Sequence, residues 1–194
     1  SMVVLAARRY YDRGEEIAGW EEHDKQCGYP VHRLDLLRPP ILPPPANKLI
    51  SAWRFLTIDI PLRARILQTT VQLIRRHQIS LLCLGELNSS AWLGSLCHRL
   101  TGCQLIYYIH GEEITTQFDA GSFGKNRFHS LARADAIIAV SRFTQSTLIE
   151  KLGLPAERVH LIENAVDTIK FSPGVDDTAF RQRWCVVGQR LVVG

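Results

Sequence analysis

Four clusters of polar side chains in this sequence each follow an apolar run, which is where an α/β protein does its chemistry. The sharpest is His110-Gly111-Glu112-Glu113, directly after the apolar residues 105–109. A histidine at the carboxyl end of a buried parallel strand lies at the crevice where such sheets bind ligands. Gly111 lets the backbone turn and a substrate approach it. Glu112 or Glu113 could orient the imidazole or accept a hydrogen bond from a hydroxyl group.

The other three clusters have a structural explanation beside the functional one. Glu86 and Asn88 follow the apolar residues 79–85 and could contact a polyol or cap a helix. Ser141 follows residues 136–140, where it could cap a helix or present a hydroxyl at the ligand-binding edge. Asn164 and Asp167 follow residues 160–162, and these residue types commonly build turns.

Several well-known chemistries lack their motifs here. The sequence contains no G-x-x-x-x-G-K-[ST] loop, no G-x-G-x-x-G after a strand and no G-x-S-x-G elbow. Cys97-His98 and Cys103 lack a second ligand pair at zinc spacing. We therefore expect no metal, no bound cofactor and no P-loop.

The alternation of apolar runs and helix-like segments defines the expected fold class. We predict strands at residues 3–7, 31–36, 79–85, 105–109, 136–140 and 160–162. We predict helices at residues 61–77, 88–101, 122–133 and 142–152. This order is typical of a Rossmann-like, doubly wound parallel α/β sheet.

Three stretches interrupt the pattern. Residues 8–30 are polar and are expected to form a long loop, and the prolines of residues 39–45 favour a stiff extended connector. The tail has a short helix pattern at 178–184, and residues 191–194 look like the start of another strand. Five scattered cysteines do not form a disulfide framework and favour a reducing, cytoplasmic compartment, with Cys83 and Cys103 expected in the core.

The net charge of +4 comes from one short stretch. Acidic and basic side chains cancel in residues 1–53 and 77–194, whereas residues 54–76 oppose Asp59 with five arginines. These are Arg54, Arg63, Arg65, Arg75 and Arg76. They could form the solvated face of a packed helix, or dock on an anionic membrane surface. No nucleic-acid-binding module is present, so nucleic acid is not expected as a partner.

The stretch from residue 134 to 173 carries a family resemblance. It reads "ADAIIAVSRFT", then "GLPAERV", then "IENAVD" followed by "FSP". This succession resembles the amino-terminal domain of GT-B glycosyltransferases of family 4. His110-Gly111-Glu112-Glu113 resembles that family's "HG.E" loop, and residues 29–33 resemble its "yPV.R" strand. The resemblance covers roughly residues 3–175.

The resemblance implies the acceptor-side half of a two-domain enzyme. Such an enzyme moves a sugar from a nucleotide sugar to an acceptor, here a glycan or lipid-linked acceptor, without metal and with retention of anomeric configuration. Carried over, His110 lies beside the donor sugar, Ser141 faces the cleft between domains, and Asn164 and Asp167 lie near that cleft. A contact with the inner face of the membrane is compatible with this reading.

The sequence departs from the family pattern at three places. Ala165 stands where the family usually has glycine; the family's first strand and Gly-rich loop should precede Val3; and the donor-binding cations of the second domain are absent. We therefore expect an incomplete acceptor-side domain at 1–175, a linker and the start of the donor-binding domain at 176–194, and no activity in this chain alone. The alternatives are a non-catalytic sugar- or nucleotide-binding module and, ranked third, a GT-B-like sugar-nucleotide epimerase.

Overall fold

The computed structural model describes residues 2–115, 128–169 and 178–183. The chain divides into two compact units, Ser1–Ile162 and Glu163–Gly194. The first unit contains every strand that the described residues form, so it carries the sheet and its core. The expected division at residues 175 and 176 stays a prediction.

The described elements alternate between strands and helices as the apolar runs predict. The strands are β1 (Val4–Ala7), β2 (Val31–Leu34), β3 (Leu81–Leu84), β4 (Gln104–Ile109), β5 (Ala136–Ala139) and β6 (Val159–Leu161). The longer helices are α3 (Ile60–Arg76) and α4 (Leu87–Thr101). Shorter ones are α1 (Trp20–Gln26), α2 (Lys48–Arg54), α5 (Glu112–Thr115), α7 (Arg142–Ser146) and α8 (Thr178–Arg183).

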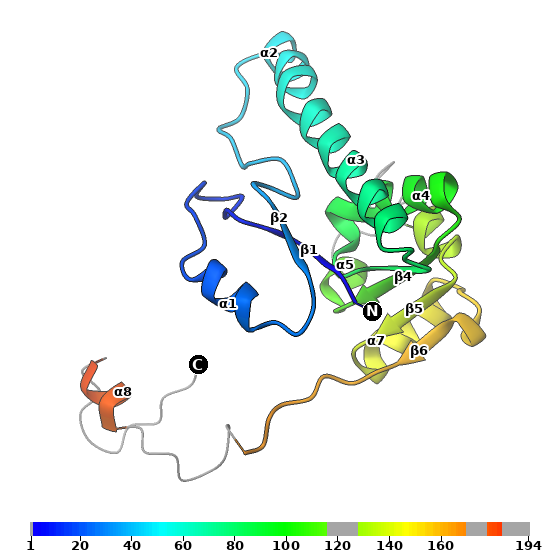
Figure 1. Ribbon diagram of the computed structural model, residues 1–194. Coiled ribbons are helices and arrows are strands. Elements are labelled where there is room, and N and C mark those ends of the chain that lie inside the picture. Colours follow the sequence, from blue (N-terminus) through cyan, green and yellow to red (C-terminus); the bar gives the residue numbers. More distant parts are fainter. Residues whose placement is uncertain (1, 116–127, 170–177, 184–194) are drawn as a thin grey trace. The chain divides into compact units, whose positions relative to one another are not determined.

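All strand pairs are parallel, which confirms the predicted fold class. Four strands form one sheet in the order β3-β4-β5-β6, and β1 pairs with β2 in a second sheet (Figure 1). The two sheets share a helical cover, because Leu34 and Leu37 pack against the same cluster as Ile66 and Ile74 of α3. The described residues therefore form two separate parallel sheets where a single sheet was expected.

The main core lies on one face of the four-stranded sheet. Leu105, Tyr107 and Ile109 of β4 are at most 1% exposed, and Ile137 and Ala139 of β5 are equally buried. The residues between them in each strand are only half-buried or exposed. Because side chains alternate between the faces of a strand, this pattern shows that one face is more completely covered than the other.

The polar stretch from residue 8 to residue 30 contains a helix, whereas the sequence predicts a long loop there. It contains α1, which is attached to β2 by an ion pair between Asp24 and Arg33. The Arg33 guanidinium donates to both oxygens of that carboxylate, at 2.9 and 2.6 Å, and also to the Ala7 carbonyl oxygen. This pairing holds the pKa of Asp24 below its usual range.

The basic stretch forms a longer helix than expected. Helix α2 continues into a wider π-helical turn, η1 (Phe55–Asp59), and then into α3, so the chain is helical from residue 48 to residue 76. Asn47 begins this helix by accepting a hydrogen bond from the Ile50 N–H at 2.8 Å. The preceding residues 39–45 have no regular structure, as their prolines predict.

The remaining boundaries differ by small amounts. Helix α4 begins at Leu87, so Glu86 and not Asn88 occupies the N-cap position, and its side chain makes no capping hydrogen bond. The helix expected at 142–152 is divided between α7 and a π-helical segment, η2 (Thr147–Lys151). Residues 128–132 are helical, while 122–127 and the strand expected at 191–194 lie outside the described residues. A short 3-10 turn, η3 (Ala156–Arg158), precedes β6.

The four described cysteines are free thiols. Cys97 and Cys103 are buried in the core as small apolar groups, but Cys83 is exposed, contrary to expectation. No helix in the described part of the chain is long and apolar enough to cross a bilayer.

We predict that the fold loses stability in alkali because two buried groups resist ionisation. Burial raises the pKa of Cys97 from 9.0 to about 12 and that of Tyr107 from 10.0 to about 12. The unfolded chain ionises these groups first, so stability present below pH 9 is lost as the pH rises towards 12. Urea unfolding between pH 8 and pH 11 measures this loss, and Tyr107→Phe should lose less stability over that range than the parent chain. Equal losses would refute the assignment to Tyr107.

Candidate functional site

Three of the predicted polar clusters meet at one edge of the four-stranded sheet. Strands β3, β4 and β5 are adjacent and parallel, with Leu84 opposite Tyr107 and Ile109 opposite Ala139. The segments that follow these strands therefore leave the sheet at the same edge. Glu86, His110 and Ser141 each lie within two residues of a strand end, so the structure places all three along this edge.

His110 is exposed at the end of β4. Its ring packs edge-on against the ring of Tyr108, with the two centroids 5.0 Å apart. The aromatic contact restricts the imidazole while leaving it accessible from solvent. This arrangement suits a side chain that meets a ligand at the sheet edge.

The two carboxylates after His110 have different environments. Glu113 is only 6% exposed, and its carboxylate accepts a hydrogen bond from the Gly111 N–H at 3.1 Å. Glu112, the preceding residue of the short helix α5 (Glu112–Thr115), is exposed. Glu113 therefore stabilises the turn itself, which leaves Glu112 as the carboxylate of this pair that is accessible at the edge.

Gly111 packs against the neighbouring loop through Thr144. Its φ of 112° is favourable only for glycine, and a Cβ atom added there would lie 3.1 Å from the Thr144 Oγ1 atom. Thr144 is 1% exposed, and its hydroxyl lies 2.9 Å from the Ser141 hydroxyl. The loops after β4 and β5 are thus in direct contact.

Ser141 caps helix α7, as one of its two interpretations predicts. Its Oγ atom accepts a hydrogen bond from the Thr144 N–H at 3.1 Å. The sequence did not single out Thr144, although it stands three residues after Ser141, where a capping hydroxyl meets its backbone N–H donor.

Glu86 is held by a residue that sequence reasoning missed. The Arg38 guanidinium donates to one oxygen of the Glu86 carboxylate at 3.0 Å and stacks over the ring of Tyr11. The Ser89 hydroxyl donates to the other carboxylate oxygen at 2.7 Å, and Asn88, which precedes Ser89 in α4, is exposed. Arg38 lies four residues beyond β2, a strand of the other sheet, so no sequence spacing links it to Glu86. Arg38 places a cation at the sheet edge.

Asn164 and Asp167 belong to the second unit. Both are exposed, and the Asp167 carboxylate accepts a hydrogen bond from the Ile169 N–H at 2.9 Å. This is the turn geometry expected of aspartate. Their predicted place beside an interdomain cleft stays a prediction.

The five arginines of the basic stretch do not share one environment. Arg54 donates to the Pro43 carbonyl oxygen, and the Arg63 guanidinium lies over the Trp92 ring with its centre 5.1 Å from the ring centroid. Arg75 lies 3.5 Å from the last-turn carbonyl oxygen of Leu100 in α4, whereas Arg65 and Arg76 are exposed. Their roles therefore have to be assigned one by one.

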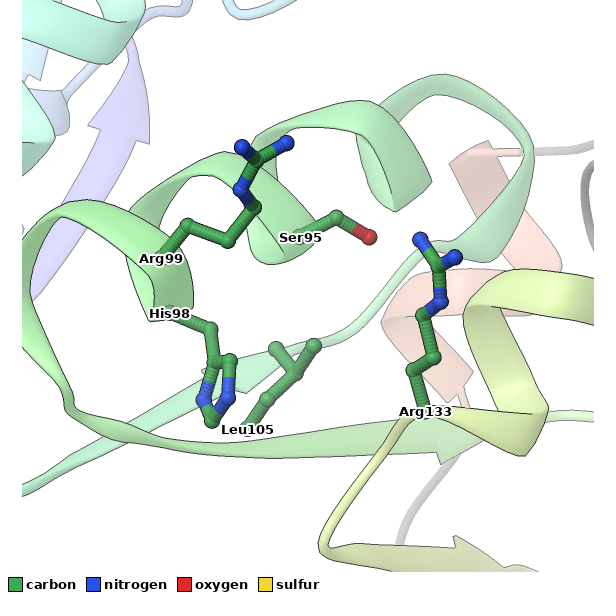
Figure 2. A pocket seen from close by; sticks show the side chains of 5 residues that line it. All are labelled: Ser95, His98, Arg99, Leu105 and Arg133. Atoms are coloured by element: carbon green, nitrogen blue, oxygen red, sulfur yellow. The ribbon is translucent and has the colours of Figure 1, made fainter.

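A separate hollow of about 260 Å³ lies at the opposite edge of the sheet (Figure 2). Figure 2 shows its lining side chains around the last turns of α4 and the start of β4. They are Ser95, His98, Arg99, Leu105 and Arg133. The His98 Nδ1 atom is 2.8 Å from the Cys103 carbonyl oxygen and 3.9 Å from the Asp135 carboxylate. No predicted site residue lines this hollow.

The fold of the chain is similar to that of two solved structures. The chain is similar to Anabaena Alr3699/HepE in complex with UDP-glucose, with 18% identity and a TM-score of 0.59 over 95% of this chain and 49% of that one. It is also similar to a glycosyltransferase from Rickettsia africae, with 15% identity and a TM-score of 0.51 over 94% of this chain and 48% of that one. The chain spans about half the length of these neighbours and has the fold of one half of a GT-B glycosyltransferase.

The sequence itself matches one family. The family model for Glycosyltransferase Family 4 covers residues 13–170, which include the whole sheet edge described above. The chain therefore belongs to Glycosyltransferase Family 4. No curated protein matches it.

We predict that Gly111→Ala destabilises the first unit. Alanine is strained at a φ of 112°, and its Cβ atom would press against Thr144 Oγ1, so we expect a loss of about 2 kcal/mol in the free energy of unfolding. Chemical denaturation of the chain measures it. Gly85→Ala is the matched control, because no heavy atom lies within 4 Å of the added Cβ there. Similar losses in both variants would contradict the proposed contact.

Removal of the Ser141 hydroxyl should weaken the same contact from the other side. Ser141→Ala leaves the Thr144 N–H without its cap, and we expect a loss of about 1 kcal/mol. Ser146→Ala removes a hydroxyl that bonds the Phe143 carbonyl oxygen near the end of α7, and should stay within about 0.5 kcal/mol of the parent. Thermal and urea unfolding compare the two; equal effects would argue against a capping role for Ser141.

Proposed function

We propose that this chain is the acceptor-side domain of a retaining, metal-independent hexosyltransferase. The whole enzyme would transfer a sugar from a nucleotide sugar to a glycan or lipid-linked acceptor in glycoconjugate synthesis. It would do so on the inner face of the membrane, in peripheral contact with it. The domain described here would hold the acceptor, and the missing half would hold most of the donor.

The observation that carries this proposal is the gathering of Glu86, His110 and Ser141 at one edge of a Family 4 sheet. His110 is the exposed imidazole among them and is proposed to lie beside the donor sugar near the reacting centre. Exposed carboxylate and amide groups at Glu112 and Asn88 suit the hydroxyl groups of a sugar acceptor. Gly111 permits close approach of a substrate to the backbone beside His110.

The same chemistry explains why we expect no turnover from this chain alone. Sugar transfer develops positive charge on the sugar and negative charge on the departing phosphate, and both must be stabilised in the transition state. At the described sheet edge Arg38 is a cation, but its guanidinium pairs with Glu86. We assign the cations that stabilise the phosphate to the other half of the enzyme, as the family resemblance implies.

The decisive experiment compares this chain with the protein that carries both halves. We expect the chain alone to release no sugar from UDP-glucose or other nucleotide sugars. The two-half protein should transfer sugar with retained anomeric configuration, seen by NMR, and at an unchanged rate in EDTA. Turnover by the chain alone at the rate of the two-half protein would overturn the proposed division of labour.

In the two-half protein, His110→Ala should lower kcat by about 100-fold or more, because it removes a polar group beside the reacting centre. His98→Gln is the matched control, since His98 lies at the opposite edge of the sheet (Figure 2). It should leave kcat within about twofold of the parent, the scatter expected of a residue remote from the reaction. A His110→Ala variant with full kcat would remove His110 from the site.

A further inference from the structure

The hollow in Figure 2 lies at the edge of the sheet where the strands begin, opposite the edge that carries His110. Ile106 pairs with Ala136, so the segments that lead into β4 and β5 enter the sheet side by side. Arg99 lies five residues before β4, and Arg133 lies three residues before β5. Both line the hollow, whose volume is about 260 Å³. Two separate segments of the chain therefore each supply one guanidinium group to the same cavity.

Neither of these guanidinium groups has a counter-ion in the part of the chain that the structure describes. Arg33 and Arg38 each pair with a carboxylate, whereas Arg99 and Arg133 make no hydrogen bond or ion pair with a described residue. Both side chains are exposed. Two positive charges at one cavity repel each other, and an anion that binds between them relieves this repulsion. The hollow therefore has the charge of an anion-binding site.

The ends of the helices explain why cations gather at this edge, but not why these two share a cavity. Cations are favourable in the last turn of a helix. Arg99 is in the last turn of α4, and Arg133 directly follows the helical residues 128–132. Arg75 has the same position in α3, but it approaches the Leu100 carbonyl oxygen and does not line the hollow. Arg99 and Arg133 differ from Arg75 because both reach one cavity.

The other side chains around the hollow are held by contacts of their own. The Ser95 hydroxyl, which lies between the two guanidinium groups in Figure 2, is hydrogen-bonded to the Tyr107 hydroxyl. The Asp135 carboxylate accepts a hydrogen bond from the Leu105 N–H at 2.7 Å and lies 3.9 Å from the His98 Nδ1 atom. Leu105 is 1% exposed and gives the hollow an apolar floor. The two arginines are therefore the groups that remain to meet a ligand.

We propose that this hollow binds the phosphate group of a small phosphomonoester. Arg99 and Arg133 donate to the phosphate oxygens, because the guanidinium fork matches phosphate geometry and a phosphomonoester carries close to two negative charges at pH 7. The organic part of the ligand lies on the floor made by Leu105. A volume of about 260 Å³ is small for a ligand site, which favours a body of about one ring over a nucleotide sugar.

This site goes beyond the proposed sugar transfer and does not depend on it. Glu86, His110 and Ser141 follow their strands, whereas Arg99 and Arg133 precede theirs, so the two sites lie at opposite edges of the sheet. A phosphate held by both arginines joins the end of α4 to the segment before β5. A ligand that binds only the folded chain raises its stability. Binding should therefore stabilise the first unit.

Calorimetric titration of the 194-residue chain with phenyl phosphate, in a buffer free of phosphate, tests the site. We expect a Kd of about 1 mM or lower and, at constant ionic strength, a higher Tm. Inorganic phosphate lacks the apolar part and benzoate carries a single charge, so each should bind at least about fivefold more weakly. Equal affinity for either of them, or no heat and no change in Tm at about 10 mM phenyl phosphate, would overturn the proposal.

Single substitutions that each remove one positive charge locate the site. Arg99→Gln and Arg133→Gln should each weaken the binding of phenyl phosphate by about tenfold, the loss expected for one charge-assisted contact. Arg65→Gln is the matched control and should bind as the parent does, because Arg65 is also exposed but lies on α3, away from the hollow. Equal weakening by Arg65→Gln, or parent affinity in both of the other variants, would refute the site.

A conservative variant separates loss of the ligand contact from loss of the fold. Arg99→Lys keeps the charge but not the guanidinium fork, so its affinity should fall between those of Arg99→Gln and the parent. Urea unfolding without ligand should be nearly unchanged in each variant, since all the substituted side chains are exposed. No nucleotide sugar is present in these titrations, so their failure leaves the proposed sugar transfer untouched, and failure of sugar transfer leaves phosphate binding untouched.

Discussion

The close approach of Gly111 to Thr144 is the constraint on which the sheet edge depends. Parallel pairing brings the ends of β4 and β5 together, but it does not fix the loops beyond them. Gly111 lets one loop turn with a positive φ and lie within contact of Thr144, while Ser141 fixes Thr144 by capping α7. The Glu113 carboxylate accepts a hydrogen bond from the Gly111 N–H. The exposed His110 therefore lies in a loop that is fixed by the contacts of Gly111 with Thr144 and with the Glu113 carboxylate.

The strands and the position of the site were predictable from sequence because both depend on local signals. Apolar runs of three to seven residues give the strands, and the first polar residues after each run lie at the ligand-binding edge of a parallel sheet. Six strands and the edge positions of Glu86, His110 and Ser141 follow from that rule. It also explains why Glu113 was grouped with Glu112: a sequence pattern does not distinguish a carboxylate that holds a turn from one that faces solvent.

The features that the sequence did not reveal depend on tertiary contacts. Helix α1 has no buried residue and no regular apolar stripe, and it is held by the ion pair between Asp24 and Arg33. Arg38 meets Glu86 across 48 residues of chain, which no spacing rule predicts. Helix α2 was missed because it follows a proline-rich segment and its seven residues, Lys48–Arg54, are too few to show a helical period in the sequence.

The local excess of positive charge identifies a basic stretch in the sequence but does not predict the contacts of its arginines. Five arginines against one aspartate first define a single basic stretch, yet the folded helix gives them separate contacts. Arg63 stacks on Trp92, Arg75 approaches the carboxyl end of α4, where a cation is favourable, and Arg54 bonds the proline-rich segment. A helix repeats every 3.6 residues, and a run of equal charges is spread around its axis. The apolar side chains of Leu49, Trp53 and Leu56, in contrast, are exposed along one side of this helix.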